Sequence, residues 1–191
     1  MINVDFSEEE FNNKALEFFN VSKLLNDNWN INHKNDKYYL TKKQFISLKS
    51  EYSQSYEDDC SDPSAVQSNE IINIEYHVLF HPSYQVPVLY FNAYEDGKLI
   101  SFHDIPKIFV NINELKTSQT ELLNIVTQAE HPILFQPFFM LHPCKVQQVL
   151  SQFKESKNFV LTFISIFGPS VKLNLSLEYQ NYFDDHPSTQ T

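Results

Sequence analysis

The stretch from 71 to 81 alternates between apolar and polar side chains, and this alternation limits what the chain can fold into. One face of an extended strand there carries apolar residues: Ile72, Ile74, Tyr76, Val78 and Phe80. The other face carries Asn73, Glu75, His77 and His81. A period of two is typical of a half-buried β-strand. A turn over 81–84, a second strand over 86–94 and a turn over 95–98 into 99–102 follow, so we predict an antiparallel meander.

Helical signals lie on both sides of this meander. Ser7 and Glu10 form a capping box, and the apolar spacing that follows them predicts a helix over 7–26. Ser118 and Glu121 repeat that signature ahead of Leu122, Ile125 and Val126, and predict a second helix before a proline-rich segment.

Two further segments carry recognisable patterns. Trp29 and Ile31, then residues 38–46, predict two short strands of a hairpin joined by a longer polar loop over 32–36. For residues 159–167 we favour a helix over a buried strand, and Gly168–Pro169 marks its end.

Together these segments predict one α+β domain over residues 1–191. The length and the 42% hydrophobic content suffice for an ordinary core. Residues 50–69 interrupt the pattern, because they are rich in acids and serines and poor in apolar side chains. We interpret them as a solvated or disordered insertion.

Composition excludes several classes of protein. With only Gly97 and Gly168, the chain lacks a glycine-rich loop to bind phosphates. A net charge of -10 with no basic run argues against nucleic acid as a partner and against anionic membrane surfaces. The longest apolar stretch is about half of the ~20 residues that a membrane span needs. Residues 1–5 lack the basic flank and apolar stretch of a signal peptide, so we expect a cytoplasmic protein with free thiols.

Cys144 is the candidate nucleophile. It follows a segment with three prolines and precedes the helical spacing of Val146, Val149, Leu150 and Phe153, which places it in the first turn of a helix. Unpaired N–H groups there, together with Lys145 and His142, favour a thiolate. The alternative is that Cys144 is a buried small apolar residue at a loop-to-helix junction. Cys60 lies among acidic residues that disfavour its thiolate, so we expect it to be incidental.

Four of the seven histidines precede a proline, including His131 and His142. For His131 we favour a structural role in which the imidazole caps a neighbouring carbonyl. His142 stands two residues before Cys144, where it can orient or polarise a group at the thiol, or act as a general base if it lies within hydrogen-bond reach. Tyr84 sits at a turn, so its hydroxyl need not be buried and can hydrogen-bond across to the cysteine loop.

Two other chemistries use some of these residues. His77, His81, His142 and Cys144 would make four zinc ligands, but no two of them have a recognised tight zinc spacing. A cysteine protease would pair Cys144 with His131, but no local protease signature surrounds either residue.

Three motifs closely resemble the autophagy-related protein 10 family: Glu75–Phe80 (EYHVLF), Ser83–Phe91 (SYQVPVLYF) and Glu130–Lys145 (EHPILFQPFFMLHPCK). The resemblance covers most of residues 71–175, with a weaker echo at 168–175. It implies a ubiquitin-conjugating-enzyme-like fold with an N-terminal helix, an antiparallel meander sheet, a cysteine loop and C-terminal helices. The first 45 residues match only in their order of helix and strands.

The resemblance also implies an activity. Cys144 would receive the C-terminal glycine of autophagy-related protein 12 as a thioester from the activating enzyme, autophagy-related protein 7. It would then pass the modifier to a lysine of autophagy-related protein 5, and no metal or small cofactor would be consumed. The alternative is a non-catalytic binding module of the same fold for a ubiquitin-like partner.

One departure concerns the oxyanion of the transfer step. Standard ubiquitin-conjugating enzymes carry a His-Pro-Asn motif several residues before the cysteine, and its asparagine helps to stabilise the oxyanion. Here His-Pro abuts Cys144 directly. The candidate oxyanion donors are therefore His142, Tyr84 and the backbone N–H groups of the Cys144 turn.

Overall fold

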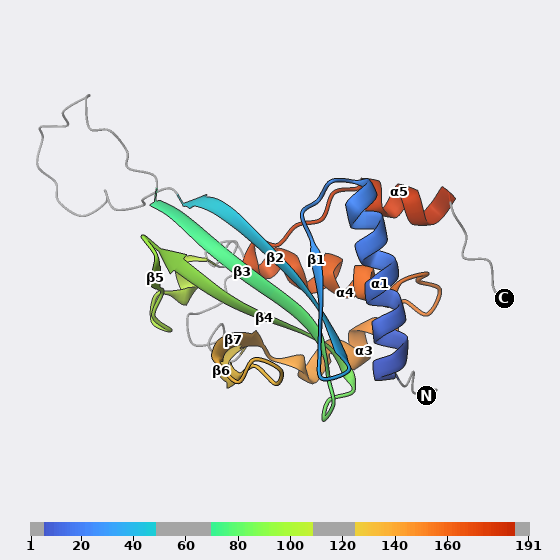
Figure 1. The fold of residues 1–191 in the computed structure, drawn as a ribbon, viewed down its shortest axis with the longest axis horizontal. Helices are drawn as coiled ribbons and strands as arrows, with labels where there is room; N and C mark the ends of the chain where they lie inside the picture. The colour runs from blue at the N-terminus through green and yellow to red at the C-terminus, as the bar shows by residue number, and fades with distance from the viewer. Residues whose placement is uncertain (1–5, 49–69, 109–124, 186–191) are drawn as a thin grey trace, which may run out of the picture.

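A computed structural model describes residues 6–48, 70–108 and 125–185 (Figure 1). The predicted insertion at 50–69, Cys60 and the predicted helix from Ser118 lie outside these residues. The strands are β1 (Asn30–Lys34), β2 (Lys37–Leu48), β3 (Glu70–His81), β4 (Val86–Glu95), β5 (Lys98–Leu99), β6 (Val126–Glu130) and β7 (Pro137–Leu141). The α-helices are α1 (Glu8–Leu24), α3 (Val146–Leu150), α4 (Phe159–Phe167) and α5 (Glu178–Asp185). Short 3₁₀ turns are η1 (Ile105–Lys107), η2 (Pro143–Lys145) and η3 (Gly168–Val171).

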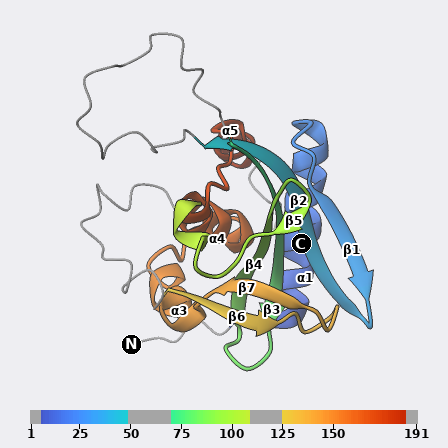
Figure 2. The ribbon, with the colours of Figure 1, turned by 90° about the vertical axis from the view of Figure 1, so that its left-hand side faces the viewer.

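The strands form one antiparallel sheet in the order β1-β2-β3-β4-β7-β6, with β5 paired to β4. The predicted meander is confirmed as β3, β4 and the short β5. The helices pack on one side of the sheet, and β6 and β7 continue it beyond β4 (Figures 1 and 2). This arrangement confirms the α+β class and is consistent with a ubiquitin-conjugating-enzyme-like fold.

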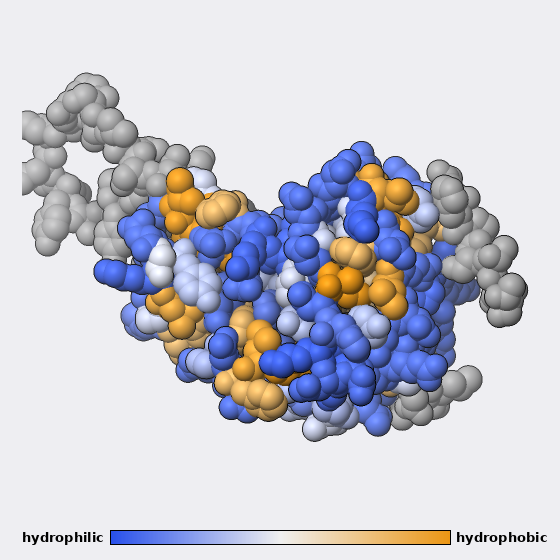
Figure 3. Space-filling view, viewed as in Figure 1, coloured by the Kyte–Doolittle hydropathy of each residue, from blue (hydrophilic) through white to orange (hydrophobic). Residues whose placement is uncertain are grey.

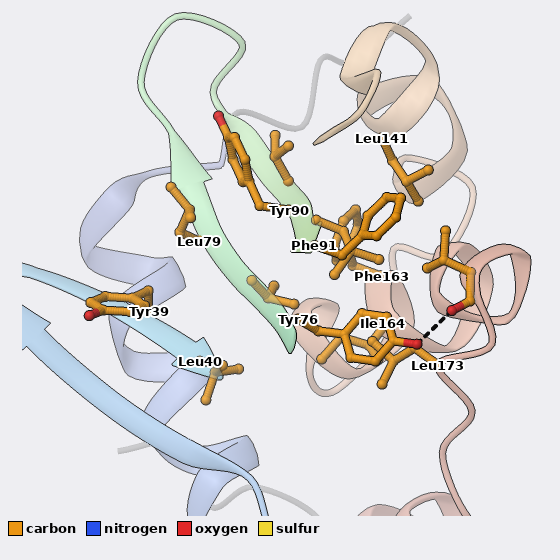
Figure 4. Close-up of a cluster of buried hydrophobic side chains, with 14 of the residues drawn as sticks. Tyr39, Leu40, Tyr76, Leu79, Tyr90, Phe91, Leu141, Phe163, Ile164 and Leu173 are labelled. Atoms are coloured by element: carbon orange, nitrogen blue, oxygen red, sulfur yellow. Dashed lines mark hydrogen bonds between the residues drawn. The ribbon is translucent and has the colours of Figure 1, made fainter. Parts of the chain in front are cut away.

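The core lies between the helices and the apolar face of the sheet that the alternation predicts. Its largest fully buried side chains include Tyr76, Phe91 and Phe163 (Figure 4). The Tyr76 hydroxyl donates to the carbonyl of Val171 at 2.7 Å, which anchors η3 against β3. Burial raises the pKa of this phenol well above its usual range, so it remains a donor.

Helix α1 begins and packs as the capping box predicts. The Ser7 hydroxyl accepts the backbone N–H of Glu10 at 3.1 Å. The three glutamates of the first turn interact favourably with the positive end of the helix dipole. Phe11, Ala15 and Phe18 are fully buried. The amphipathic spacing therefore identified both the helix and its buried face.

Several sequence predictions about boundaries are wrong. The first hairpin has a two-residue turn, Asn35–Asp36, because both residues adopt positive φ and support a tight turn that suits twisted strands. Val126 begins strand β6 rather than ending a helix. Phe153 lies beyond α3 and is 48% exposed.

Helix α4 spans Phe159–Phe167 and ends at Gly168–Pro169, as the sequence predicts. Gly168 keeps right-handed helical angles, and the left-handed residue that ends the turn is Lys172. Gly168 is required for close approach instead, because a Cβ there would lie 2.5 Å from the carbonyl oxygen of Leu173. Helix α5 carries no specific sequence prediction; its Tyr179 ring stacks on Phe18, and its hydroxyl donates to Asp27 at 2.8 Å.

The surface is mixed in character. Exposed apolar side chains are scattered over several elements and separated by hydrophilic ones in the view of Figure 3. Among the described residues, no helix is both long enough and apolar enough to span a bilayer.

Candidate active site

Cys144 lies at the junction between β7 and the short helix α3. Strand β7 ends at Leu141, His142 caps the 3₁₀ turn η2, and Cys144 is the central residue of that turn. Its side chain is exposed, so the sequence alternative of a buried apolar cysteine is wrong. An exposed thiol at a rigid strand-to-helix junction is accessible to a macromolecular substrate.

The His142 side chain is bonded directly to the cysteine turn. Its Nδ1 accepts the backbone N–H of Cys144 at 3.2 Å, and its own backbone N–H donates to the Ile125 carbonyl at 2.7 Å. In the neutral ring, Nδ1 is therefore the acceptor and Nε2 carries the proton. Neither nitrogen is then free to remove a proton, which disfavours the general-base role. The Nε2–H remains a donor with no hydrogen-bond partner among the described residues.

This cap also removes one candidate oxyanion donor. Because the N–H of Cys144 already donates to His142, it is not free to bind developing charge on a carbonyl oxygen. Of the sequence candidates, the His142 Nε2–H and the Tyr84 hydroxyl stay available in this arrangement.

Tyr84 lies on the turn between β3 and β4, beside the cysteine turn. Its ring makes an edge-to-face contact with His142, at 6.0 Å between centroids, and it is 43% exposed. The predicted hydrogen bond from its hydroxyl to the cysteine loop is not present among the described residues. The contact between them is ring to ring.

Pairing of β4 with β7 brings these two segments together. Tyr90 is opposite Met140 and Phe91 is opposite Phe139, so the end of β7 that leads to Cys144 lies near the β3–β4 turn. Asn92 adds a hydrogen bond to the Pro137 carbonyl at 3.1 Å. Burial, and secondarily the nearby Tyr84, raise the pKa of Tyr90 to about 12. Tyr90 is therefore a neutral, buried side chain (Figure 4), and its ring contacts His131 at 5.2 Å between centroids.

A separate imidazole cluster is formed by His77, on β3, and His131, in the turn between β6 and β7. Both are buried, with 3% and 0% of their surface exposed, and the His77 Nδ1 lies 3.1 Å from the His131 Nε2. The His131 Nδ1 accepts the N–H groups of Ile133 and Leu134, each at 3.2 Å. His131 therefore organises the β6–β7 turn and is not paired with Cys144, as the protease alternative required.

These contacts fix one arrangement of protons. Because the His131 Nδ1 accepts two N–H groups, its proton is on Nε2 and is donated to His77. The His77 proton is then on Nε2, which faces a Glu75 carboxylate oxygen at 3.2 Å. This bond is the main cause that lowers the pKa of Glu75. Burial, followed by the neighbouring His77, lowers the pKa of His131 to about 4.

Three His-Pro pairs share one local turn. In His81, His131 and His142 the Nδ1 accepts the backbone N–H two residues ahead, immediately after the proline. The predicted capping of a carbonyl by His131 is therefore wrong, because its Nδ1 accepts N–H groups and its Nε2 faces His77. The turn resembles the one that asparagine and aspartate form with their own backbone. The repeated His-Pro dipeptide was the available signal for it.

The proposed zinc ligands do not converge. His77 uses both ring nitrogens in hydrogen bonds, to His131 and Glu75. Over residues 6–48, 70–108 and 125–185, no group of three or more histidine, cysteine or acidic side chains is arranged to hold a metal ion.

Comparison with known proteins places the sequence in a family. The family model described as "Autophagocytosis associated protein, active-site domain" matches residues 10–178. The chain belongs to this family. The matched range includes Cys144, His142 and Tyr84, so all three candidate residues lie within the family's active-site domain.

Members of the family from distant organisms are similar to the chain. It is 40% identical over 130 residues to the ubiquitin-like-conjugating enzyme ATG10 of Homo sapiens, covering 64% of this chain and 59% of that protein. The ATG10 proteins of Arabidopsis thaliana and Dictyostelium discoideum are 32% and 27% identical, over 59% and 56% of this chain and 55% and 54% of their own lengths. The chain thus spans little more than half the length of these relatives.

Proposed function

We propose that this protein is a ubiquitin-like conjugating enzyme of autophagy that carries its modifier on Cys144. The observation that carries the proposal is the exposed thiol of a His-Pro-Cys turn, within an active-site domain whose relatives are named as conjugating enzymes. The modifier is autophagy-related protein 12, the donor is autophagy-related protein 7, and the acceptor is a lysine of autophagy-related protein 5. We place the protein in the cytoplasm, where thiols are kept reduced, because a thioester forms only on a reduced cysteine.

Loading is an exchange of one thioester for another. The Cys144 thiolate attacks the carbonyl carbon of the modifier's C-terminal glycine, which is held as a thioester on the activating enzyme. The new C–S bond forms as the old one breaks, and the activating enzyme leaves as a thiolate. The step needs an accessible sulfur, and the exposure of Cys144 supplies it.

Transfer forms an isopeptide bond. The neutral lysine amine attacks the same carbonyl carbon, the tetrahedral intermediate loses a proton from nitrogen to solvent, and the Cys144 thiolate leaves. Negative charge develops on the carbonyl oxygen, so a preorganised donor accelerates the step. We assign this donor role to the Nε2–H of His142 and assign Tyr84 to orienting the amine. The fixed tautomer of His142 and its contact with Tyr84 support these roles.

A charging assay tests the proposal. The protein is incubated with the activating enzyme, ATP and the modifier, then run on gels with and without reductant. We expect a reductant-sensitive adduct that Cys144→Ala abolishes and Cys60→Ser leaves intact. The proposal is wrong if no such adduct forms, or if Cys60→Ser removes it while Cys144→Ala does not. Binding of the modifier without an adduct would instead indicate the non-catalytic module.

A further inference from the structure

Tyr84 lies between two imidazoles. On one side is His142, and on the other is His81, the last residue of β3, whose ring centroid is 4.9 Å from that of Tyr84 at an interplanar angle of 62°. Both contacts are edge to face, an arrangement that attracts aromatic rings. The zinc site that would have used His81 does not form among the described residues, and the proposed mechanism gives His81 no role.

His81 is itself held in place by the turn that carries Tyr84. Its Nδ1 accepts the N–H of Ser83 at 3.3 Å, and its carbonyl accepts the N–H of Gln85 at 2.8 Å. Pro82 fixes the backbone between them, and Gln85 closes the turn in the left-handed region at φ 52°. The imidazole therefore belongs to a closed turn, and its ring has a defined orientation against Tyr84.

Tyr84 has few other restraints. It is 43% exposed, and its hydroxyl makes no hydrogen bond to the rest of the described chain. A tyrosine at such a site would otherwise exchange among staggered χ1 rotamers. The ring contacts with His81 and His142 are thus what holds the phenol beside the cysteine turn.

We propose that His81 is a positioning residue that acts through Tyr84 in the transfer step. It holds the phenol against His142, beside the turn that carries Cys144. Burial, and secondarily the charge of Lys37, lower the pKa of His81, which keeps the ring neutral and its Nδ1 able to accept the Ser83 N–H. This inference rests on the proposed function and adds a residue to it.

Three substitutions separate the two properties of His81. His81→Phe keeps an aromatic ring but loses the acceptor, His81→Asn keeps an acceptor for the Ser83 N–H but loses the ring, and His81→Ala loses both. We expect His81→Ala and His81→Asn to slow single-turnover discharge to the acceptor lysine by up to about threefold, the loss expected when the Tyr84 hydroxyl is removed, and His81→Phe to keep the wild-type rate. Loading of Cys144 should stay at the wild-type rate in all three.

His33→Ala is a matched control. The exposed His33 also contacts a tyrosine ring, stacking on Tyr38 at 4.5 Å between centroids, but among the described residues no interaction links either of them to the cysteine turn. Its discharge rate should equal that of the wild type.

A second background tests whether His81 acts through Tyr84. In Tyr84→Ala protein, adding His81→Ala should cause no further loss of discharge rate, because the ring it positions is gone. In wild-type protein, nuclear Overhauser contacts between the Tyr84 and His142 rings should be present. They should weaken in His81→Ala and persist in His81→Phe.

Each contrary result identifies what has failed. Normal loading with unchanged discharge in His81→Ala overturns the positioning role alone, as does an equal loss in the Tyr84→Ala background. Restoration by His81→Asn but not by His81→Phe would show that only the turn matters and also overturns it. If the wild type never loads Cys144, the proposed function fails, and the transfer role of His81 fails with it. Nuclear Overhauser contacts between Tyr84 and His142 that persist in His81→Ala would overturn the positioning role, and this measurement does not depend on an activity assay.

Discussion

The two imidazole clusters of this protein use the same turn in opposite environments. His131 and His142 both precede a proline, and both accept the backbone N–H two residues ahead. His131 is buried, and its second nitrogen is bonded to His77. His142 is half-buried, and its second nitrogen has no hydrogen-bond partner among the described residues. The same local geometry therefore stabilises a turn in one case and leaves a fixed donor beside a thiol in the other.

The two imidazole clusters differ in how many of their ring nitrogens have a hydrogen-bond partner within the protein. In the buried cluster every ring nitrogen of His77 and His131 has a protein partner, so the cluster can only stabilise structure. We call His81 and His142, with the exposed Tyr84 between them, the exposed cluster; its two turns use Nδ1 alone. The comparison predicts that variants of the buried cluster lose stability, whereas variants of the exposed one lose transfer rate.

The largest expected effect is on the buried cluster. His131→Ala leaves two backbone N–H groups and a His77 nitrogen without partners in the core, so the free energy of unfolding should fall by about 3 kcal/mol. Urea unfolding measures it. His131→Asn, which keeps an acceptor for the turn, should lose less. A loss below about 1 kcal/mol in His131→Ala would mean that the cluster does not stabilise the fold.

Acid should destabilise the protein through the same cluster. The pKa of His131 is about 4 in the fold, below its ordinary value of 6.5, so the unfolded chain binds more protons between these values. Stability from this group is therefore complete above about pH 6.5 and declines as pH falls toward 4, by about 2 kcal/mol at pH 5. The charges that act on the ring are those of His77, Glu75 and Lys34. Thermal unfolding from pH 7.5 to 5 measures the decline, and an equal decline in His131→Asn would assign it to other groups.

The next effect falls on transfer at the exposed cluster. His142→Ala removes both the cap on Cys144 and the proposed oxyanion donor, so discharge should slow about tenfold, equivalent to about 1.4 kcal/mol. His142→Asn provides an acceptor for the Cys144 N–H and an amide donor, so it should recover most of the rate. Unfolding free energies should change by less than about 1 kcal/mol, because the side chain is half-buried. Wild-type discharge in His142→Ala would remove His142 from the mechanism.

The smallest effect is expected at Tyr84. Tyr84→Phe keeps the ring contacts with His81 and His142 but removes the hydroxyl, so discharge should slow about threefold while loading is unchanged. Single-turnover assays with preloaded enzyme separate the two steps. If loading slows as much as discharge, the phenol acts on the thiol rather than on the incoming amine.

Sequence reasoning succeeded where a pattern was periodic or matched a long motif. The alternation around Tyr76 located β3 and its buried face, and the capping box at Ser7 located α1. The position of Cys144 at the start of a helical turn also followed from the flanking prolines and the spacing after them. Each of these features depends on residues close together in the chain.

The features that sequence missed depend on distant contacts or on backbone detail. The proline-rich segment before Cys144, which the sequence described only as a cysteine loop, contains strands β6 and β7, because β7 pairs with β4 and with β6. The partner of His131 is His77, 54 residues away, and nothing local indicates that pairing. The role of Nδ1 as an acceptor depends on ring orientation, so the sequence suggested a carbonyl as the partner of His131 where the structure has N–H groups. The bond from the Ser83 N–H to His81, which the sequence offered only as a zinc ligand, depends on ring orientation in the same way.

The central claim is that the exposed cluster serves a thioester on Cys144. Charging wild-type protein and Cys144→Ser side by side, and analysing both with and without reductant, tests it most directly. The account predicts a reductant-sensitive adduct on the wild type and a reductant-resistant oxygen ester on Cys144→Ser, because the same carbonyl is then held by oxygen. A reductant-sensitive adduct that persists on Cys144→Ser would contradict it, since the modifier would then be carried by another thiol.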